Sequence, residues 1–266
     1  MKKSIFLIIM LTIKLLNAQD FHMNVGTEGI VGFSNARSFG KFVDSYNKEF
    51  EKDLAKKLRN IGFVSGYGIQ SKFFYSSFSS LYVAFNYSHL TGSSYAKFNN
   101  GTRRYFELKE NYYCTNVGLG KYDAGKGFAA GVISVGINNM NVQTYQKYKD
   151  GTISMGNETY LSGSYKGFAM LFSPQVVGGW HITEHLVLSF TLTYHFNFFG
   201  LGNIDYFNMD EVGKNLDLVK ANSIPEDYQK FLANPNLGIV YDDDQVKFNF
   251  NGLKLGIGLE YNLINK

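Results

Sequence analysis

Strict alternation of large apolar residues with glycine or polar residues limits this chain more than any other feature of its sequence. The alternation is unbroken near the C-terminus, where each second residue is apolar: Leu253, Leu255, Ile257, Leu259, Tyr261 and Leu263. The positions between them hold Lys254, Gly256, Gly258, Glu260 and Asn262. Successive side chains of a strand point to opposite faces of a sheet, so the pattern predicts a strand with one apolar face.

Seven further segments alternate in the same way, which gives eight predicted strands. They cover residues 23–33, 63–72, 81–88, 113–120, 133–138, 168–182, 186–198 and 253–263. Each can supply the roughly 9–11 residues that a tilted strand needs to cross a bilayer, and single-chain bacterial barrels have an even number of strands. Pro174 falls inside the sixth segment, where it removes a ladder hydrogen bond and predicts a bulge.

The connections between these segments alternate in length. Three are short (residues 75–80, 123–126 and 183–184), and the others are mostly longer (34–60, 149–161 and 200–244), apart from a small turn at 99–101. Short periplasmic turns opposite long extracellular loops are typical of outer-membrane barrels, and an even strand number then predicts that both termini are periplasmic. Four aromatic residues near the short turns predict an aromatic girdle: Tyr75, Tyr122, Trp180 and Tyr261.

The face opposite the apolar one distinguishes a membrane barrel from a soluble, lipocalin-like barrel. In water that face would be rich in charged residues and threonine, but here it is mostly small: Gly66, Gly68, Ala84, Gly118, Gly120, Ser189, Gly256 and Gly258. Small side chains suit the interior of a narrow barrel, and a sheet in lipid must close because unpaired backbone groups are costly there. We therefore predict an all-β protein, an eight-stranded antiparallel transmembrane up-and-down β-barrel with short helices in its extracellular loops.

The N-terminus has the pattern of an export signal. Lys2 and Lys3 precede an apolar run from Ile5 to Leu11, and the segment 16–18 ends in a small residue. We expect residues 1–18 to be a signal peptide and residues 19–266 to form the outer-membrane β-barrel domain. Without the three lysines of the signal, the formal net charge falls from +4 to about +1, which disfavours a nucleic-acid partner.

In these respects the chain resembles small outer-membrane barrels of the OmpA, OmpX and porin-like families. The resemblance depends on the export signal, the strand number, the segment Leu255–Leu263 and the alternation of short turns with long loops. It covers nearly the whole mature chain and includes no catalytic motif. It implies a location in the outer membrane of the Gram-negative cell envelope, in contact with outer-membrane lipid.

Six polar residues on the inward face of the predicted strands are candidates for a network in the lumen. They are Glu28, Gln70, Lys72, His195, Lys254 and Glu260. An eight-stranded barrel is just wide enough for side chains to fill it, and buried charges must pair. We therefore predict a lumen plugged by a polar network, with no catalytic residue, metal or cofactor. One alternative is a narrow porin-like channel for small solutes. Another is a lipid-modifying enzyme in which His195 acts with Ser189 or Thr193, or His89 with Ser88.

The first and last long loops differ in charge. The first, 34–60, holds seven basic and four acidic residues, and the last, 200–244, holds nine acidic and three basic residues. Ring closure makes these loops neighbours, so we predict a cap over the outer mouth formed by Lys52, Lys56, Lys57, Asp242, Asp243 and Asp244. Three consecutive carboxylates lack the spaced ligands of a calcium loop, so no metal site is predicted there.

Helices are predicted in both loops. In the first, the spacing of Val43, Tyr46, Phe50, Leu54 and Leu58 predicts an amphipathic helix between residues 43 and 60. In the last, Ser223 with Glu226 has the pattern of a helix start. Taken together, the sequence predicts a structural or interaction protein whose extracellular loops contact an envelope protein partner or a surface polysaccharide.

Overall fold

The computed structural model describes residues 21–35, 37–75, 81–123, 125–154, 163–201 and 250–265. Its elements are β1 (Phe21–Asn35), α2 (Arg37–Glu49), β2 (Leu54–Lys56), β3 (Phe63–Tyr75), β4 (Leu81–Phe98), β5 (Arg103–Asp123), β6 (Gly127–Lys147), β7 (Ile153–Ser154), β8 (Gly163–His181), β9 (Leu186–Leu201) and β10 (Asn251–Asn265). The predicted signal peptide and the predicted helix after Ser223 lie outside the described residues. No helix in the described part of the chain is long and apolar enough to cross a membrane.

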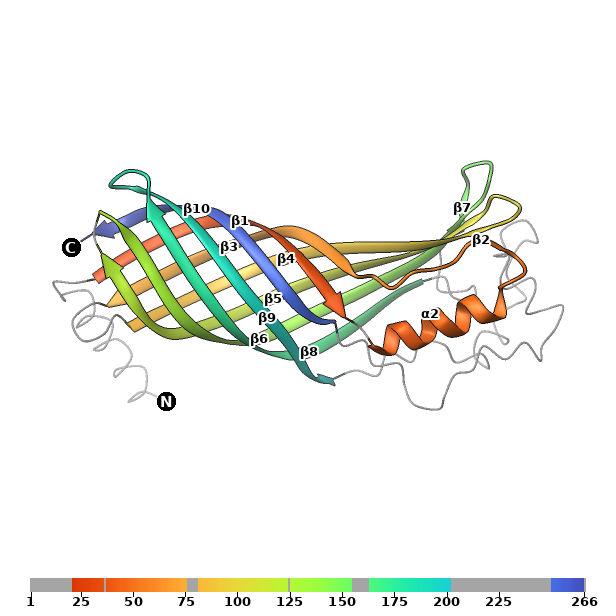
Figure 1. The fold of residues 1–266 in the computed structure, drawn as a ribbon, viewed down its shortest axis with the longest axis horizontal. Coiled ribbons are helices and arrows are strands. Elements are labelled where there is room, and N and C mark those ends of the chain that lie inside the picture. Colours follow the sequence, from red (N-terminus) through yellow and green to blue (C-terminus); the bar gives the residue numbers. More distant parts are fainter. Residues whose placement is uncertain are drawn as a thin grey trace, which may run out of the picture.

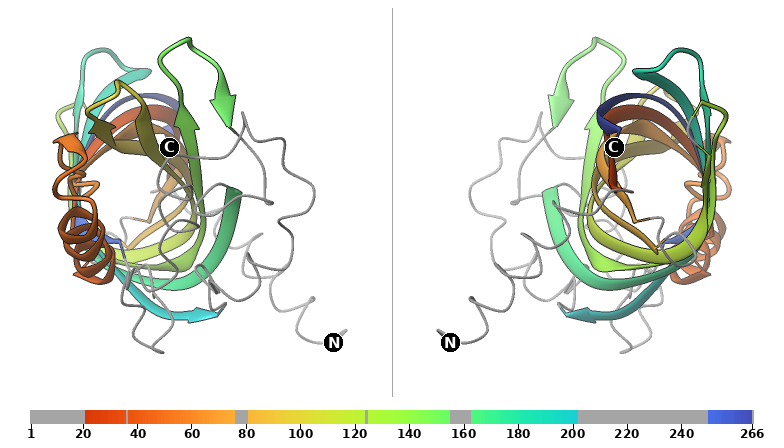
Figure 2. Two further views of the ribbon diagram at one scale, coloured as in Figure 1. Left: turned by 90° about the vertical axis from the view of Figure 1, so that its right-hand side faces the viewer. Right: turned by 90° about the vertical axis from the view of Figure 1, so that its left-hand side faces the viewer.

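Eight of the strands form a closed antiparallel ring. The order around it is β1, β3, β4, β5, β6, β8, β9 and β10, and β10 pairs with β1 to close the sheet (Figure 2). The predicted eight-stranded up-and-down barrel is confirmed. The short strands β2 and β7 are additions that pair with β4 and β6. His22 of β1 lies opposite Asn265 of β10, so the first and last strands begin and end at one end of the barrel, which we call the turn end.

The outer surface of the ring is apolar. Leu188, Leu255 and Ile257 would lie at the centre of a soluble barrel, but their side chains are 44%, 43% and 59% exposed. Polar side chains such as Asn24, Lys72 and Glu260 are buried inside the ring instead. The lipocalin-like alternative is therefore excluded, because it requires the opposite arrangement.

Three strands continue well beyond most of the barrel, and β8 accompanies β6 as far as the pair of Gly163 with Thr144. Figure 1 shows β4, β5 and β6 running past the ends of β1 and β10 toward β2 and β7. We call this region the extension; it comprises residues 89–98 of β4, 103–112 of β5 and 139–147 of β6, together with residues 37–60, which include α2 and β2. The turn predicted at 99–101 joins β4 to β5, and Gly101 there has a φ of 95°, which favours glycine. These strands are therefore much longer than the segments 81–88, 113–120 and 133–138 predicted from the sequence.

The alternation changes phase where the extension begins. Ser88 and Leu90 of β4 are both buried and both face inward, although one is polar and the other apolar. Beyond this point apolar residues such as Leu108 and Val142 face inward, and polar residues such as Gln143 face outward. The predicted strands ended at this change because the apolar face of the barrel does not continue across it.

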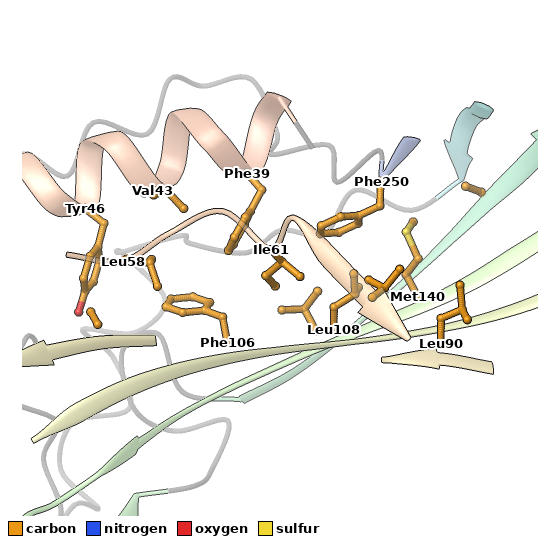
Figure 3. Close-up of a cluster of buried hydrophobic side chains, with 14 of the residues drawn as sticks. Phe39, Val43, Tyr46, Leu58, Ile61, Leu90, Phe106, Leu108, Met140 and Phe250 are labelled. Carbon is orange, nitrogen blue, oxygen red and sulfur yellow. The ribbon is translucent and has the colours of Figure 1, made fainter. Parts of the chain in front are cut away.

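The helix α2 covers the inner face of the extension. Phe39, Val43 and Tyr46 of α2 share one apolar core with Phe106 and Leu108 of β5 (Figure 3). The helix predicted for 43–60 is partly wrong, because α2 starts at Arg37 and ends at Glu49. After a turn, Leu54 pairs with Phe98 in β2, and Leu58 reaches the same core from an extended segment. A spacing of four residues fits a strand as well as a helix, so it did not distinguish the two.

Pro174 does not cause the predicted bulge. It stays in register with Ile133 of β6, and the shift in the pairing of β8 with β9 lies between Ala169 and Met170. The pairs on both sides of Pro174, Phe172 with Phe196 and Gln175 with Thr193, keep one register. The sheet therefore tolerates the missing N–H group of this proline without an inserted residue.

Candidate functional site in the lumen and the extension

An apolar layer fills the lumen at the turn end. Phe74 lies at its centre, with its ring centroid 4.7 Å from that of Phe128 and 5.0 Å from that of Tyr122. Tyr122 was predicted for the girdle on the outer surface, and this prediction is wrong: the side chain is buried inside and stacks on His22 with centroids 3.9 Å apart. Trp180 and Tyr261 do face outward, at 72% and 52% exposure.

Glu260 is the centre of a first polar cluster. Its carboxylate forms an ion pair with Lys72 and accepts hydrogen bonds from Asn24 Nδ2 at 3.1 Å and Gln70 Nε2 at 3.2 Å. All four side chains are buried, and they come from the adjacent strands β1, β3 and β10. The cluster therefore connects the strands on both sides of the seam where the ring closes. It joins three of the six residues predicted for the lumen.

Glu110, at the base of the extension, is the centre of a second polar cluster. It accepts hydrogen bonds from Tyr112 Oη at 2.6 Å and Asn138 Nδ2 at 3.1 Å, and Lys254 Nζ lies 3.4 Å from its other oxygen. Lys254 was predicted to lie in the lumen, but Glu110 was not, because the predicted strand started at Tyr113. Extending the alternation of that strand by three residues would have found it.

His195 and Glu28 line a small cavity between the two clusters. The cavity has a volume of about 20 Å³, which is room for roughly one water molecule. His195 Nδ1 lies 2.7 Å from Ser173 Oγ, and the ring stacks on Tyr112. Its partner is thus Ser173 and not Ser189 or Thr193. Among the described residues no hydrogen bond reaches Glu28 Oε2, although the side chain is buried.

The lumen is therefore filled in layers. The apolar layer lies at the turn end, the two carboxylate clusters lie in the middle, and the apolar core under α2 lies at the opposite end, in the extension. All six residues predicted for the lumen network are inside the ring, and each carboxylate cluster holds a lysine. No group of three His, Cys, Asp or Glu side chains in the described ranges is placed to hold a metal ion.

The chain matches no protein-family model and no curated protein sequence. Solved structures with a similar arrangement include Neisserial surface protein A, with 8% identity over 90% of this chain and 96% of that one at a TM-score of 0.39. Ail of Yersinia pestis, an attachment invasion locus protein, has 6% identity over 92% of this chain and 98% of that one, at a TM-score of 0.37. The outer-membrane protease OmpT of Escherichia coli has 6% identity over 93% of this chain and 98% of that one, at a TM-score of 0.38. A closed ring with apolar residues outside and charged residues inside is stable only in lipid. This chain has the fold of a small outer-membrane β-barrel.

The structure places only part of the predicted cap of this outer-membrane barrel. Lys52 and Lys57 are exposed beside α2, and Lys57 forms an ion pair with Glu51 at 2.9 Å. Lys56 lies in β2, where its Nζ is 3.7 Å from the ring centroid of Tyr95. Asp242, Asp243 and Asp244 lie outside the described residues, so the charge pairing across the mouth stays a prediction. What covers the inner face of the extension is α2, through apolar contacts.

Proposed function

We propose that this barrel is a non-conducting, non-enzymatic interaction protein that presents its extension outside the cell. The observation that carries the proposal is the contrast between a lumen filled by side chains and an extension made of three long strands and a packed helix. A channel needs a continuous path, whereas here the clusters around Glu260 and Glu110 lie between two apolar layers. The partner is an envelope protein or a surface polysaccharide.

Planar-bilayer recordings test the closed lumen. We expect no steady conductance from the purified protein, because hydrated ions would have to displace buried, paired charges. The matched comparison replaces Phe74 and Phe128, in the apolar layer at the turn end, by alanine and keeps both carboxylate clusters. If the wild-type protein conducts steadily at low voltage, the channel alternative is correct and the proposal fails.

The absence of enzymatic activity is supported by the surroundings of His195. His195 faces a cavity that holds about one water molecule, and its partner Ser173 is fully buried, so a lipid cannot reach either side chain. A nucleophile also needs an orienting acid behind its base, and no described carboxylate hydrogen-bonds to His195. Incubation of the protein with outer-membrane lipids, followed by mass spectrometry, should show no product that disappears on replacing His195 by Ala.

The proposed orientation places the extension outside and both termini in the periplasm. A cysteine introduced at Asn100, in the turn of the extension, should react with a membrane-impermeant maleimide on intact cells. One introduced at Lys126, at the turn end, should react only after the outer membrane is opened. The wild-type protein is the blank, because its one cysteine, Cys114, is buried. If Lys126→Cys is labelled on intact cells and Asn100→Cys only after the outer membrane is opened, the barrel has the opposite orientation.

The interaction role itself is tested by retention. The full chain in nanodiscs is presented to arrayed glycans and to envelope protein extracts, with empty nanodiscs as the blank. We expect specific retention that competes with soluble antibody fragments against α2. A protein that retains nothing from either source would leave the barrel with a structural role only.

A further inference from the structure

Four basic residues form one row across the outward face of the extension. Lys56 of β2 pairs with Lys97 of β4, Lys97 with Arg103 of β5, and Arg103 with Lys147 of β6. We call these four residues the cationic row. Arg103 and Lys147 are exposed, and Lys56 and Lys97 are half-buried. The row therefore crosses four neighbouring strands without an acidic residue between its members.

A row of three tyrosines lies directly beside the cationic row. Tyr95, Tyr105 and Tyr145 are paired across β4, β5 and β6, and their ring centroids are 5.4 Å and 5.0 Å apart in stacked geometry. Arg103 Nη1 donates a hydrogen bond to Tyr105 Oη at 3.3 Å, and the ammonium of Lys56 lies over the ring of Tyr95. These contacts hold two of the four cations in place on the sheet surface.

The cationic row is unfavourable for the fold by itself. Like charges directly opposite each other on neighbouring strands destabilise a sheet, and the row contains three such pairs. Among the described residues none of the four forms a salt bridge with a carboxylate. The carboxylate of the neighbouring Glu107 instead accepts a hydrogen bond from Tyr145. Stability of the sheet therefore gives no reason for four adjacent cations, whereas binding an external anion does.

The position of the row excludes the lipid surface as its natural partner. On β4 the last outward aromatic residue beside the apolar band is Tyr87, and Lys97 follows ten residues later. At about 3.3 Å per residue and a tilt of about 40°, this places the row roughly 25 Å beyond the band. Lipid headgroups lie much closer to the acyl chains than that.

We propose that the cationic row binds an anionic polysaccharide outside the membrane, one that carries sulfate or carboxylate groups along its chain. This inference rests on the proposed interaction function and names the partner class. Neighbouring strands are about 4.8 Å apart, so the four cations form a line about 15 Å long. A linear polymer with repeated negative charges meets all four cations, whereas a small anion meets one or two. The tyrosine hydroxyls beside the row supply hydrogen-bond partners for sugar hydroxyls.

Binding to dextran sulfate tests this proposal, with neutral dextran of the same length as the blank. The full chain in phosphatidylcholine nanodiscs should bind dextran sulfate, and the affinity should fall as salt rises because screening shortens the range of the charges. The row variant combines Lys97→Gln, Arg103→Gln and Lys147→Gln. It should bind at least about tenfold more weakly, since each lost charge-assisted hydrogen bond is worth more than a neutral one.

The control variant combines Lys48→Gln, Lys52→Gln and Lys109→Gln, which removes the same charge from exposed positions of the extension outside the row. It should keep most of the wild-type affinity. If both variants lose affinity equally, the net charge attracts the polymer and the row is not a site, which overturns the proposal. All six side chains are exposed or half-buried. Unchanged circular dichroism and unchanged migration of the folded barrel in gels confirm folding.

Two further probes separate the partner classes. Nanodiscs that contain lipopolysaccharide should bind the row variant as strongly as they bind the wild type. If the row variant loses affinity for lipopolysaccharide alone, the row binds the cell's own membrane and not an external polysaccharide. Poly-glutamate should bind more weakly than dextran sulfate, and the opposite order would indicate an acidic protein partner. If the wild type and the row variant retain the same glycans or envelope proteins equally well, the proposed interaction function is supported, and the proposal that the row is a polysaccharide site is wrong.

Discussion

The barrel and its extension are built from the same strands with opposite polarity. In the barrel, Leu255 and Ile257 face outward and Lys72 and Glu260 face inward. In the extension, Leu108 faces inward under α2, and the outward positions are polar or tyrosine. Strand pairing continues across the boundary without a break in β4, β5 or β6. The surrounding solvent, lipid in one region and water in the other, therefore decides which phase of the alternation is stable.

This comparison is tested most strongly by unpairing a charge in the barrel. Glu260→Ala leaves Lys72 buried with its charge unpaired, which we expect to destabilise the barrel by about 3–5 kcal/mol. Urea unfolding in detergent, followed by the shift between folded and unfolded bands on a gel, measures the change. Replacing both partners, by Lys72→Met with Glu260→Leu, should cost much less. An equal loss for the single and the double change would contradict the ion pair's role.

The apolar core of the extension should respond locally. Phe106 is buried against Phe39 and Tyr46 of α2, with centroids 5.8 Å and 6.3 Å away. Phe106→Ala should lower the stability of this core by about 3 kcal/mol. This value is near the lower limit for such a truncation, because α2 can move inward and fill part of the cavity. Limited proteolysis should then cut within 37–60 sooner, while unfolding of the barrel stays unchanged. Loss of barrel stability as well would mean that the two regions fold as one unit.

A lysine introduced on the outer face distinguishes the two solvents directly. Ile257→Lys places a charge on the lipid-facing surface and should cost about 2–3 kcal/mol in insertion and folding. Gln143→Lys makes a change of similar size on the outward face of the extension and should cost almost nothing. Folding into vesicles of defined composition, measured for both variants, provides the comparison. Equal costs would place the extension in lipid.

The same inversion explains how far the sequence predicted the structure. The eight strands, their order and the outward apolar face followed from alternation in segments such as 253–263, where one face is continuously apolar. Beyond Ser88 the inward face changes from polar to apolar at Leu90, so a pattern of constant phase ends there. Glu110 was missed for this reason, and the cationic row was not recognised because its register depends on pairing between four strands. Leu171 and Val177, which interrupted the alternation of β8, belong to the apolar cores at the two ends of the lumen.

The smallest expected effect comes from the exposed ion pair of the extension, the counterpart of the buried pair in the barrel. Lys57 Nζ lies 2.9 Å from Glu51 Oε1, and this hydrogen bond lowers the pKa of Glu51 below its ordinary value of 4.5. A lowered pKa means that any stabilisation is present above pH 4.5 and is lost as the pH falls through the pKa of the folded state. Both side chains are largely exposed, so solvent screens the pair and stability should not change measurably.

Lys57→Gln should return the pKa of Glu51 to about 4.5, as followed by NMR of labelled glutamate, and Lys52→Gln should leave it lowered. An unchanged pKa in Lys57→Gln would show that the pair does not form in solution, whereas a large loss of stability would mean that this region is shielded from water as the barrel is.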